Sequence, residues 1–146
     1  MSWENITWIF LHSYAEKIKI NFFEKHKNNC LGLIKYTCCN LPCKICSKHA
    51  TDYFKKYNVL KCKTKEDLKK FLWVFHNNVN KRLKKPLFKY EGLDKYKKAN
   101  FLNILKKFLY EYEKKYVYTR TMDSWLRKNY TKKVKLFLII NKHQFN

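Results

Sequence analysis

Two cysteines separated by two residues, Cys43 and Cys46, are the first residues whose types and spacing could do chemistry. This spacing allows the two thiols to close a small disulfide. Pro42 precedes the pair directly and suits the first turn of a helix, so both cysteines should lie at or near a helix N-terminus. The helix dipole and the nearby Lys44 and Lys48 favour the reactive thiolate. The motif therefore indicates redox chemistry or metal binding.

Zinc binding is the main alternative for this CxxC motif. Cys38 or Cys39, together with Cys43, Cys46 and His49, would supply the thiolate and imidazole ligands that tetrahedral zinc prefers. A thioredoxin-like motif fits less well, because the βαβ context of that fold is missing. The spacing alone leaves the choice between zinc and redox chemistry open.

A second group of polar residues begins at His76 and ends at Pro86. On a helix, His76, Asn80 and Leu83 share one face and Asn77 lies beside them. Cations gather near the end of that helix: Arg82, Lys84 and Lys85. Planar hydrogen-bonding groups next to cations suit an adenine ribose and a pyrophosphate. Taken singly, His76 could equally be a core histidine and the lysines a solvated helix end.

The third group is Trp8 with His12, which lie one helical turn apart. The pair could offer a stacking plane and an imidazole to a cofactor ring. On its own, such a pair is also typical of core packing.

Long helices must position these residues, because only two glycines and two prolines interrupt 146 residues. One core is expected. Apolar spacing predicts helices over 3–23, 31–36, 42–57, 64–83 and 93–116, of which the one opened by Thr64 and Asp67 is the strongest. Beyond residue 118 the pattern weakens: Trp125 and Leu126 suit a short helix, and 134–140 could be a strand, a helix or a docked tail. The sequence predicts an all-α bundle.

The charge of the chain is strongly positive, at a formal +22, and is carried mostly by lysine. Such a charge would attract nucleic acid or anionic surfaces. Base readout favours arginine, of which there are three, so most lysines are equally consistent with solvated helix faces. No apolar run approaches the length of a membrane span, and the N-terminus lacks a signal-peptide pattern. A cytoplasmic protein is expected. Cysteines normally stay reduced in that compartment unless they bind metal or do redox chemistry, so the six cysteines point to one of these two roles.

The order of the three motifs resembles the Erv/ALR family of FAD-linked sulfhydryl oxidases. The similarity covers residues 3–105 and is greatest to compact viral members, those of African swine fever virus and the poxviruses. The matching residues are Trp8-xxx-His12, Pro42-Cys43-xx-Cys46 and His76-Asn77-x-Val79-Asn80-xx-Leu83-x-Lys85-Pro86. Three ordered motifs at compatible separations are more specific than any one of them.

This resemblance implies a four-helix bundle with a short fifth helix, a bound FAD and a homodimer. It implies that Cys46 passes electrons to the flavin and that Cys43 exchanges disulfides with substrate thiols. Arg82 stands where many relatives have lysine. The implied FAD site comprises Trp8, His12, Cys46, His76, Asn77, Val79, Asn80, Arg82, Leu83 and Lys85, with Tyr14, His49 and Trp73 as weaker candidates and no metal ligand.

The resemblance also implies substrates and a location. The substrates would be thiol-containing proteins, above all CxxC redox proteins, and O2 would be reduced to H2O2. A viral member would act in the host cytoplasm or the virion. Residues 1–105 would form the oxidase domain, and 106–146 a basic, helical extension that could bind nucleic acid or anionic surfaces weakly. A zinc-stabilised adaptor and a basic nucleic-acid-binding module are the alternative functions.

Some features have no counterpart in the family. Lys55 and Trp73 occupy the places of a structural disulfide found in cellular relatives. Four cysteines have no role that the resemblance can supply: Cys30, Cys38, Cys39 and Cys62. Cys38 and Cys39 could form a shuttle pair, although adjacent buried thiols are the simpler interpretation.

Overall fold

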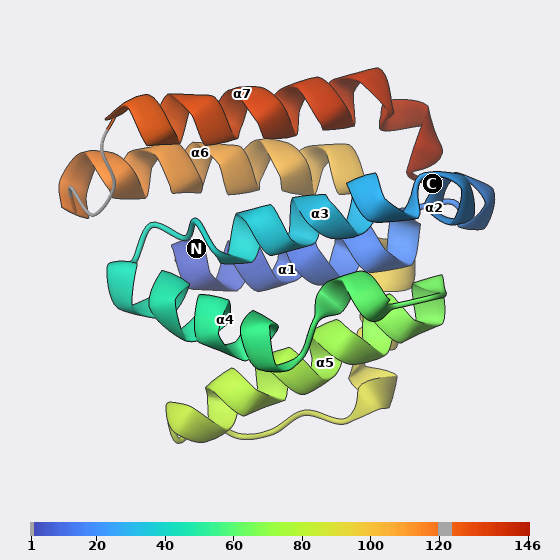
Figure 1. The fold of residues 1–146 in the computed structure, drawn as a ribbon, viewed down its shortest axis with the longest axis horizontal. Helices are drawn as coiled ribbons and strands as arrows, with labels where there is room; N and C mark the ends of the chain where they lie inside the picture. Colours follow the sequence, from blue (N-terminus) through green and yellow to red (C-terminus); the bar gives the residue numbers. More distant parts are fainter. Residues whose placement is uncertain (1, 120–123) are drawn as a thin grey trace.

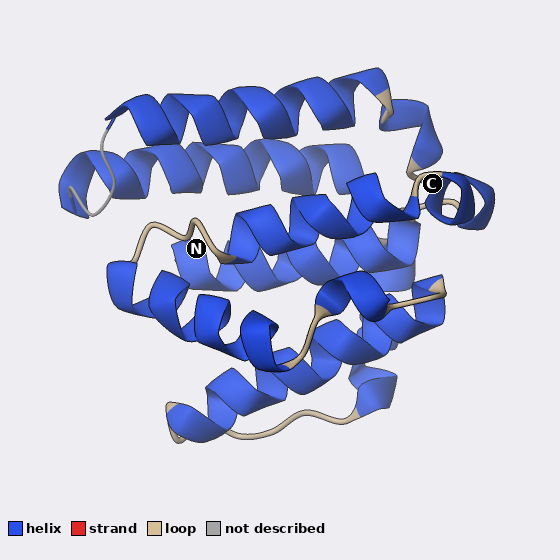
Figure 2. Cartoon of the chain, in the orientation of Figure 1, coloured by secondary structure: helices blue, strands red, loops and turns tan. Residues whose placement is uncertain are grey.

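The computed structural model describes residues 2–119 and 124–146, and helices run through most of them (Figure 1). Within these residues no β-strand forms, as Figure 2 shows. The elements are α1 (Trp3–Lys17), α2 (Ile20–Lys25), α3 (Lys27–Cys38), α4 (Lys44–Lys56), η1 (Val59–Lys61), α5 (Lys65–Arg82), η2 (Tyr90–Lys98), α6 (Phe101–Thr119), α7 (Ser124–Ile140) and η3 (Lys142–Gln144). The predicted all-α fold is confirmed.

Helix α1 forms the centre of the fold. It packs against α5 and η2 on one side and against α6 on the other. In Figure 1, α6 and α7 lie together along one side of the molecule and α4 and α5 along the opposite side. Fully buried aromatic side chains join the layers: Phe10 of α1 stacks on Phe108 of α6 with ring centroids 4.3 Å apart. One core therefore supports both the motif-bearing helices and the C-terminal pair.

Helix α5 begins where the sequence predicts, at a capping box. The Asp67 amide donates to Thr64 Oγ1 at 3.0 Å, and the Thr64 amide donates to Asp67 Oδ2 at 3.1 Å. Reciprocal bonds of this kind satisfy two amides that have no partner within the helix. Leu68, Leu72 and Phe75 form the buried face. The cap and the apolar face thus fix the helix that carries His76 to Arg82.

The first helix is shorter than predicted. A helix over 3–23 is interrupted at Ile18 and Lys19, which both have extended backbone. The C-terminal tail causes the interruption: Ile18 pairs with Phe145 as an isolated β-bridge, and the Lys19 amide donates to Gln144 O at 2.8 Å. These bonds replace helical ones, and the competing segment lies more than 120 residues away in the sequence.

The expected helix over 93–116 is wrong at its beginning. Residues Tyr90–Lys98 form a 3₁₀-helix, Ala99 is extended, and α6 begins at Phe101. Leu93 and Tyr96 are both buried, and a spacing of three places them on one face of a 3₁₀-helix. The Asn103 amide donates to Asn100 Oδ1 at 3.1 Å, which supports a helix start there.

The C-terminal region is helical. Of the three structures that the sequence allowed for 134–140, a helix is the one that forms, as part of α7, and Trp125 and Leu126 lie in the same helix. Tyr130, Val134 and Leu138 of α7 are fully buried. The expected boundary at residue 105 falls within α6, which packs on α1 along the core.

Among the described residues, none of the helices combines the length and the apolar character that a membrane crossing needs.

Candidate redox and cofactor site

The two cysteines of the CxxC motif form a disulfide at the beginning of α4, with Cα atoms 5.1 Å apart. Cys43 is the N-cap residue of α4, and its sulfur accepts a hydrogen bond from the Cys46 amide at 3.2 Å. The Ser47 hydroxyl donates to Leu41 O at 2.9 Å and holds the preceding loop against the helix. The predicted position at a helix N-terminus is confirmed, and there the helix dipole stabilises a thiolate on reduction.

A cavity of about 210 Å³ lies beside Cys46, between α1, α4 and α5. Cys46 lines it, whereas Cys43 is not among the lining residues. Most of the predicted cofactor residues meet here: Trp8, Cys46, His76, Val79, Asn80, Arg82, Leu83 and Lys85. The structure therefore gathers three motifs that are separate in the sequence around one cavity.

The indole of Trp8 and the imidazole of His76 form a stacked pair at this cavity. Their ring centroids are 3.8 Å apart and their planes differ by 6°. Behind them, His12 Nε2 lies 3.0 Å from His76 Nδ1, so one imidazole donates a hydrogen bond to the other. The pair needs one proton on one of these nitrogens and a lone pair on the other.

Both imidazoles are held neutral by their surroundings. Burial lowers the pKa of His12 to about 3, with further contributions from His76 and Lys95. Burial also lowers the pKa of His76 to about 4, with Lys95 and Lys85 acting in the same direction. The hydrogen bond between the two rings needs at least one neutral imidazole, and the two lowered pKa values make both rings neutral near pH 7.

Two predicted cofactor residues, His12 and Asn77, do not line the cavity but support it. Asn77 exchanges two hydrogen bonds with the backbone of Phe88: its Nδ2 donates to Phe88 O at 2.9 Å, and the Phe88 amide donates to Oδ1 at 3.1 Å. Trp73 Nε1 also donates to Phe88 O, at 2.9 Å. The Phe88 ring in turn packs edge-on against His12 and His76. Asn77 thus fixes the segment after α5 against the histidine pair.

The three weaker candidates for the cofactor site, His49, Tyr14 and Trp73, lie in different parts of the structure. His49 lines the cavity, and its Nδ1 is buried without a hydrogen-bond partner among the described residues. Tyr14 is fully buried in the core, where its hydroxyl donates to Cys30 O at 2.9 Å. Trp73 lies on Phe88, outside the cavity lining.

Sequence reasoning missed part of the cavity wall. The residues concerned are Trp3, Glu4, Asn5, Thr7, Leu11, Cys38, Leu41, Ala50 and Phe75. Glu4, Asn5 and Leu11 lie three or four residues from Trp8, so helical spacing could have placed them on its face. The positions of Cys38 and Leu41 depend on the packing of α3 and could not be found in this way.

These residues fit a nucleotide cofactor with a flat ring system and a pyrophosphate, as expected for FAD. The Trp8 and His76 rings offer an apolar surface, and the Asn80 amide can bind polar edges. Arg82 and Lys85 provide positive charge for phosphates. The unpartnered Nδ1 of His49 is a polar atom that such a ligand could satisfy.

The remaining cysteines are thiols that do not form disulfides. Cys30, Cys38 and Cys62 are buried and Cys39 is partly exposed. Burial raises the pKa of both Cys30 and Cys62 to about 11 and that of Cys38 still further. Among the described residues, no group of three or more His, Cys, Asp or Glu side chains is placed to hold a metal ion.

Comparison with known proteins gives matches to one family. The sequence model of the Erv1/Alr family matches residues 5–109. An FAD-linked sulfhydryl oxidase of African swine fever virus (isolate Tick/Malawi/Lil 20-1/1983) is 31% identical over 105 residues, which are 72% of this chain and 87% of the relative. The enzyme of isolate Pig/Kenya/KEN-50/1950 is 34% identical over 106 residues, 73% of this chain and 86% of the relative. No solved structure matches the chain significantly.

Proposed function

The chain belongs to the Erv1/Alr family, and we propose that it is an FAD-linked sulfhydryl oxidase that forms disulfides in protein substrates. One observation carries the proposal: the Cys43–Cys46 disulfide lies at a helix N-terminus with Cys46 in the wall of a cavity that fits the cofactor. The two cysteines therefore divide the work, with Cys46 next to the cofactor and Cys43 toward the substrate.

The thiol chemistry follows from this division. A substrate thiolate attacks the sulfur of Cys43, which breaks the Cys43–Cys46 bond and releases Cys46 as a thiolate. A second substrate thiolate then attacks the mixed disulfide, so the substrate leaves as a disulfide and Cys43 leaves as a thiolate. The N-terminus of α4 stabilises both leaving thiolates. Bound FAD supplies the two-electron acceptor that restores the protein disulfide and that O2 reoxidises with formation of H2O2.

Roles in cofactor binding follow from the position of each side chain. Trp8 and His76 present apolar ring surface, while Val79 and Leu83 line the cavity with them. Asn80, Arg82 and Lys85 bind polar and phosphate groups. His12 and Asn77 act indirectly, through His76 and Phe88.

The proposal also includes the substrates of the enzyme, its oligomeric state and its place of action. Substrates are thiol-containing proteins, including CxxC redox proteins, and the enzyme works as a homodimer, which the family resemblance supports. Because the relatives are viral, the place of action is the host cytoplasm or the virion. Residues 1–105 contain every proposed redox and cofactor residue, and the basic extension 106–146 contributes α7 and most of α6 to the same core. The formal charge of +22 supports weak binding to nucleic acid or anionic surfaces.

The test combines an absorption spectrum with thiol-dependent O2 consumption. The purified protein should show bound flavin and oxidise dithiothreitol, and Cys46→Ser should bind flavin but lose turnover. Cys43→Ser should also lose turnover, whereas Cys39→Ser, at a cysteine outside the disulfide, should keep it. A colourless protein with stoichiometric zinc would contradict the proposal and favour the zinc-stabilised adaptor.

A further inference from the structure

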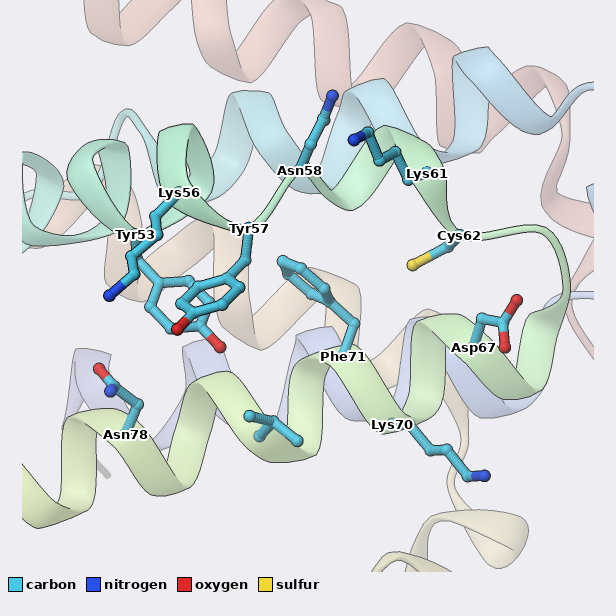
Figure 3. A pocket seen from close by; sticks show the side chains of 11 residues that line it. Tyr53, Lys56, Tyr57, Asn58, Lys61, Cys62, Asp67, Lys70, Phe71 and Asn78 are labelled. Atoms are coloured by element: carbon cyan, nitrogen blue, oxygen red, sulfur yellow. The ribbon is translucent and has the colours of Figure 1, made fainter.

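A second hollow of about 650 Å³ lies on the outer face of the molecule, between α4, η1 and α5 (Figure 3). We call it the α4–α5 groove. Its lining is largely apolar: Tyr53 and Tyr57 come from the α4 side and Phe71 from α5, as Figure 3 shows. Val74 is a further residue of α5 that lines the groove. Val74 is 49% exposed and Tyr57 is 47% exposed. An aliphatic and an aromatic side chain thus remain open to solvent in a concave surface.

The α4–α5 groove also carries an excess of positive charge, with three lysines against one carboxylate in its lining. Lys56, Lys61 and Lys70 line it, and none of them forms a salt bridge within the part of the chain that the structure describes. The carboxylate in the lining belongs to Asp67, and one of its oxygens accepts hydrogen bonds from the Lys63 and Thr64 amides at 2.9 and 3.1 Å. That carboxylate is therefore engaged in the cap of α5. The groove suits a ligand that is both acidic and apolar.

Helix α4 borders both the groove and the redox disulfide. Cys43 caps the N-terminus of α4, while Tyr53 and Lys56 lie near its C-terminus. At about 1.5 Å per residue, Cys43 and Tyr57 are separated by roughly 20 Å along the helix. An extended peptide covers this distance with about six residues. One substrate segment can thus occupy the groove while a cysteine of the same chain reaches Cys43.

We propose that the α4–α5 groove is a docking site for an acidic, apolar segment of the protein thiol substrate. The proposal rests on the proposed oxidase function and adds the class of substrate. A peptide fits better than single-stranded nucleic acid because the groove offers one exposed aromatic ring beside exposed aliphatic surface, not a series of open rings. Lys56 Nζ lies over the Tyr57 ring, 5.4 Å from its centroid, and Tyr53 packs against Phe71 and Phe75. Of the aromatic rings in the lining, Tyr57 is the exposed one and Lys56 lies over it, so successive bases would find no row of open rings to stack on.

The experiment compares two substrates of the FAD-loaded protein. Dithiothreitol is too small to contact the groove while it reacts with Cys43. The second substrate is a synthetic peptide with a CxxC motif and, six residues away, the segment Glu-Phe-Glu-Leu-Glu. In Lys56→Glu/Lys70→Glu the KM for the peptide should rise about tenfold, because two attractive charges become repulsive. Turnover of dithiothreitol should stay unchanged. Lys106→Glu/Lys107→Glu, with the same charge change on exposed positions of α6, is the matched control and should leave both substrates unaffected.

Direct binding separates this inference from the oxidase proposal. A fluorescent version of the peptide with both cysteines replaced by serine should bind the wild type, and its affinity for Val74→Asp should be about tenfold lower.

Unchanged peptide KM and binding in the groove variants would overturn the docking site even if dithiothreitol is oxidised. Equal binding of a peptide with glutamine at each glutamate would also overturn it. Displacement of the peptide by an oligo-dT strand that loses affinity in the same variants would assign the groove to nucleic acid. Absence of dithiothreitol oxidation by the wild type would instead count against the oxidase function alone.

Discussion

The Tyr130 hydroxyl donates a hydrogen bond to Thr37 Oγ1 at 2.9 Å, which joins α7 to α3 across 93 positions of the sequence. A second hydroxyl acts beside it: Tyr112 of α6 donates to Asn40 O at 2.9 Å. The two phenol rings are buried, with centroids 4.4 Å apart. Thr37 and Asn40 lead directly into Pro42 and the redox disulfide. The C-terminal helices therefore hold the segment from which the CxxC motif begins.

Tyr130→Phe should lower the free energy of unfolding by about 1–2 kcal/mol, because the buried Thr37 hydroxyl loses this partner while the ring volume is retained. Urea unfolding of the flavin-free protein measures the change. Tyr110→Phe is the matched control, since Tyr110 is 64% exposed, and should alter stability by less than about 0.5 kcal/mol. Equal stability of the two variants would show that the hydrogen bond contributes nothing.

Stability should fall as the pH is lowered from about 6.5 toward 4. His12 and His76 have an ordinary pKa of 6.5 and folded values of about 3 and 4, so in this window the unfolded chain binds more protons. For the buried His12 the slope approaches about 1.4 kcal/mol per pH unit. The groups that face the pair include Lys95, Lys85 and the Tyr96 ring. Lys95 lowers the pKa of both histidines and Lys85 lowers that of His76, because each lysine disfavours a positive charge on the imidazole.

Urea midpoints measured between pH 7 and pH 4 check this dependence. His12→Asn should flatten the slope, because it removes one of the two titrating groups. His143→Asn, at an exposed histidine, is the control and should leave the slope as in the wild type. A wild-type stability that is constant over this window would contradict the neutral, hydrogen-bonded pair.

Asn77→Ala should destabilise the protein by about 1–3 kcal/mol, because it removes both hydrogen bonds to Phe88 and leaves the Phe88 amide without that acceptor. It should also weaken FAD binding, since the Phe88 ring packs against the two histidines. Thermal unfolding and flavin titration measure the two effects. Asn78→Ala, at the adjacent exposed position, should change neither, and a similar loss there would argue against the specific role of Asn77.

Lys85→Gln should weaken FAD binding several-fold and reduce its dependence on salt, because one cation is removed from the cavity wall. Flavin titrations at low and high ionic strength give both quantities. Lys81→Gln is the matched control: it changes the same charge on an exposed position of α5 outside the cavity lining. Identical salt dependence in the two variants would place the phosphates elsewhere.

The sequence by itself determined the local features of this protein. The capping box at Thr64, the apolar spacing of Leu68, Leu72 and Phe75, and the CxxC motif at a helix start all depend on residues close together in the chain. The order of the three motifs also identified the family. These predictions succeed because caps and periodicity report interactions within one or two helical turns.

Only the tertiary structure decided how distant residues meet. The bond between His12 and His76, the role of Asn77 against Phe88 and the contact of Tyr130 with Thr37 join separate elements. The break after α1 has the same origin, because its backbone pairs with Gln144 and Phe145 at the other end of the chain. Spacing cannot reveal such partners, since it describes a helix face but not which surface covers that face. Packing in three dimensions selects them, because most buried polar groups are stable only with a hydrogen-bond partner, which can come from any part of the chain.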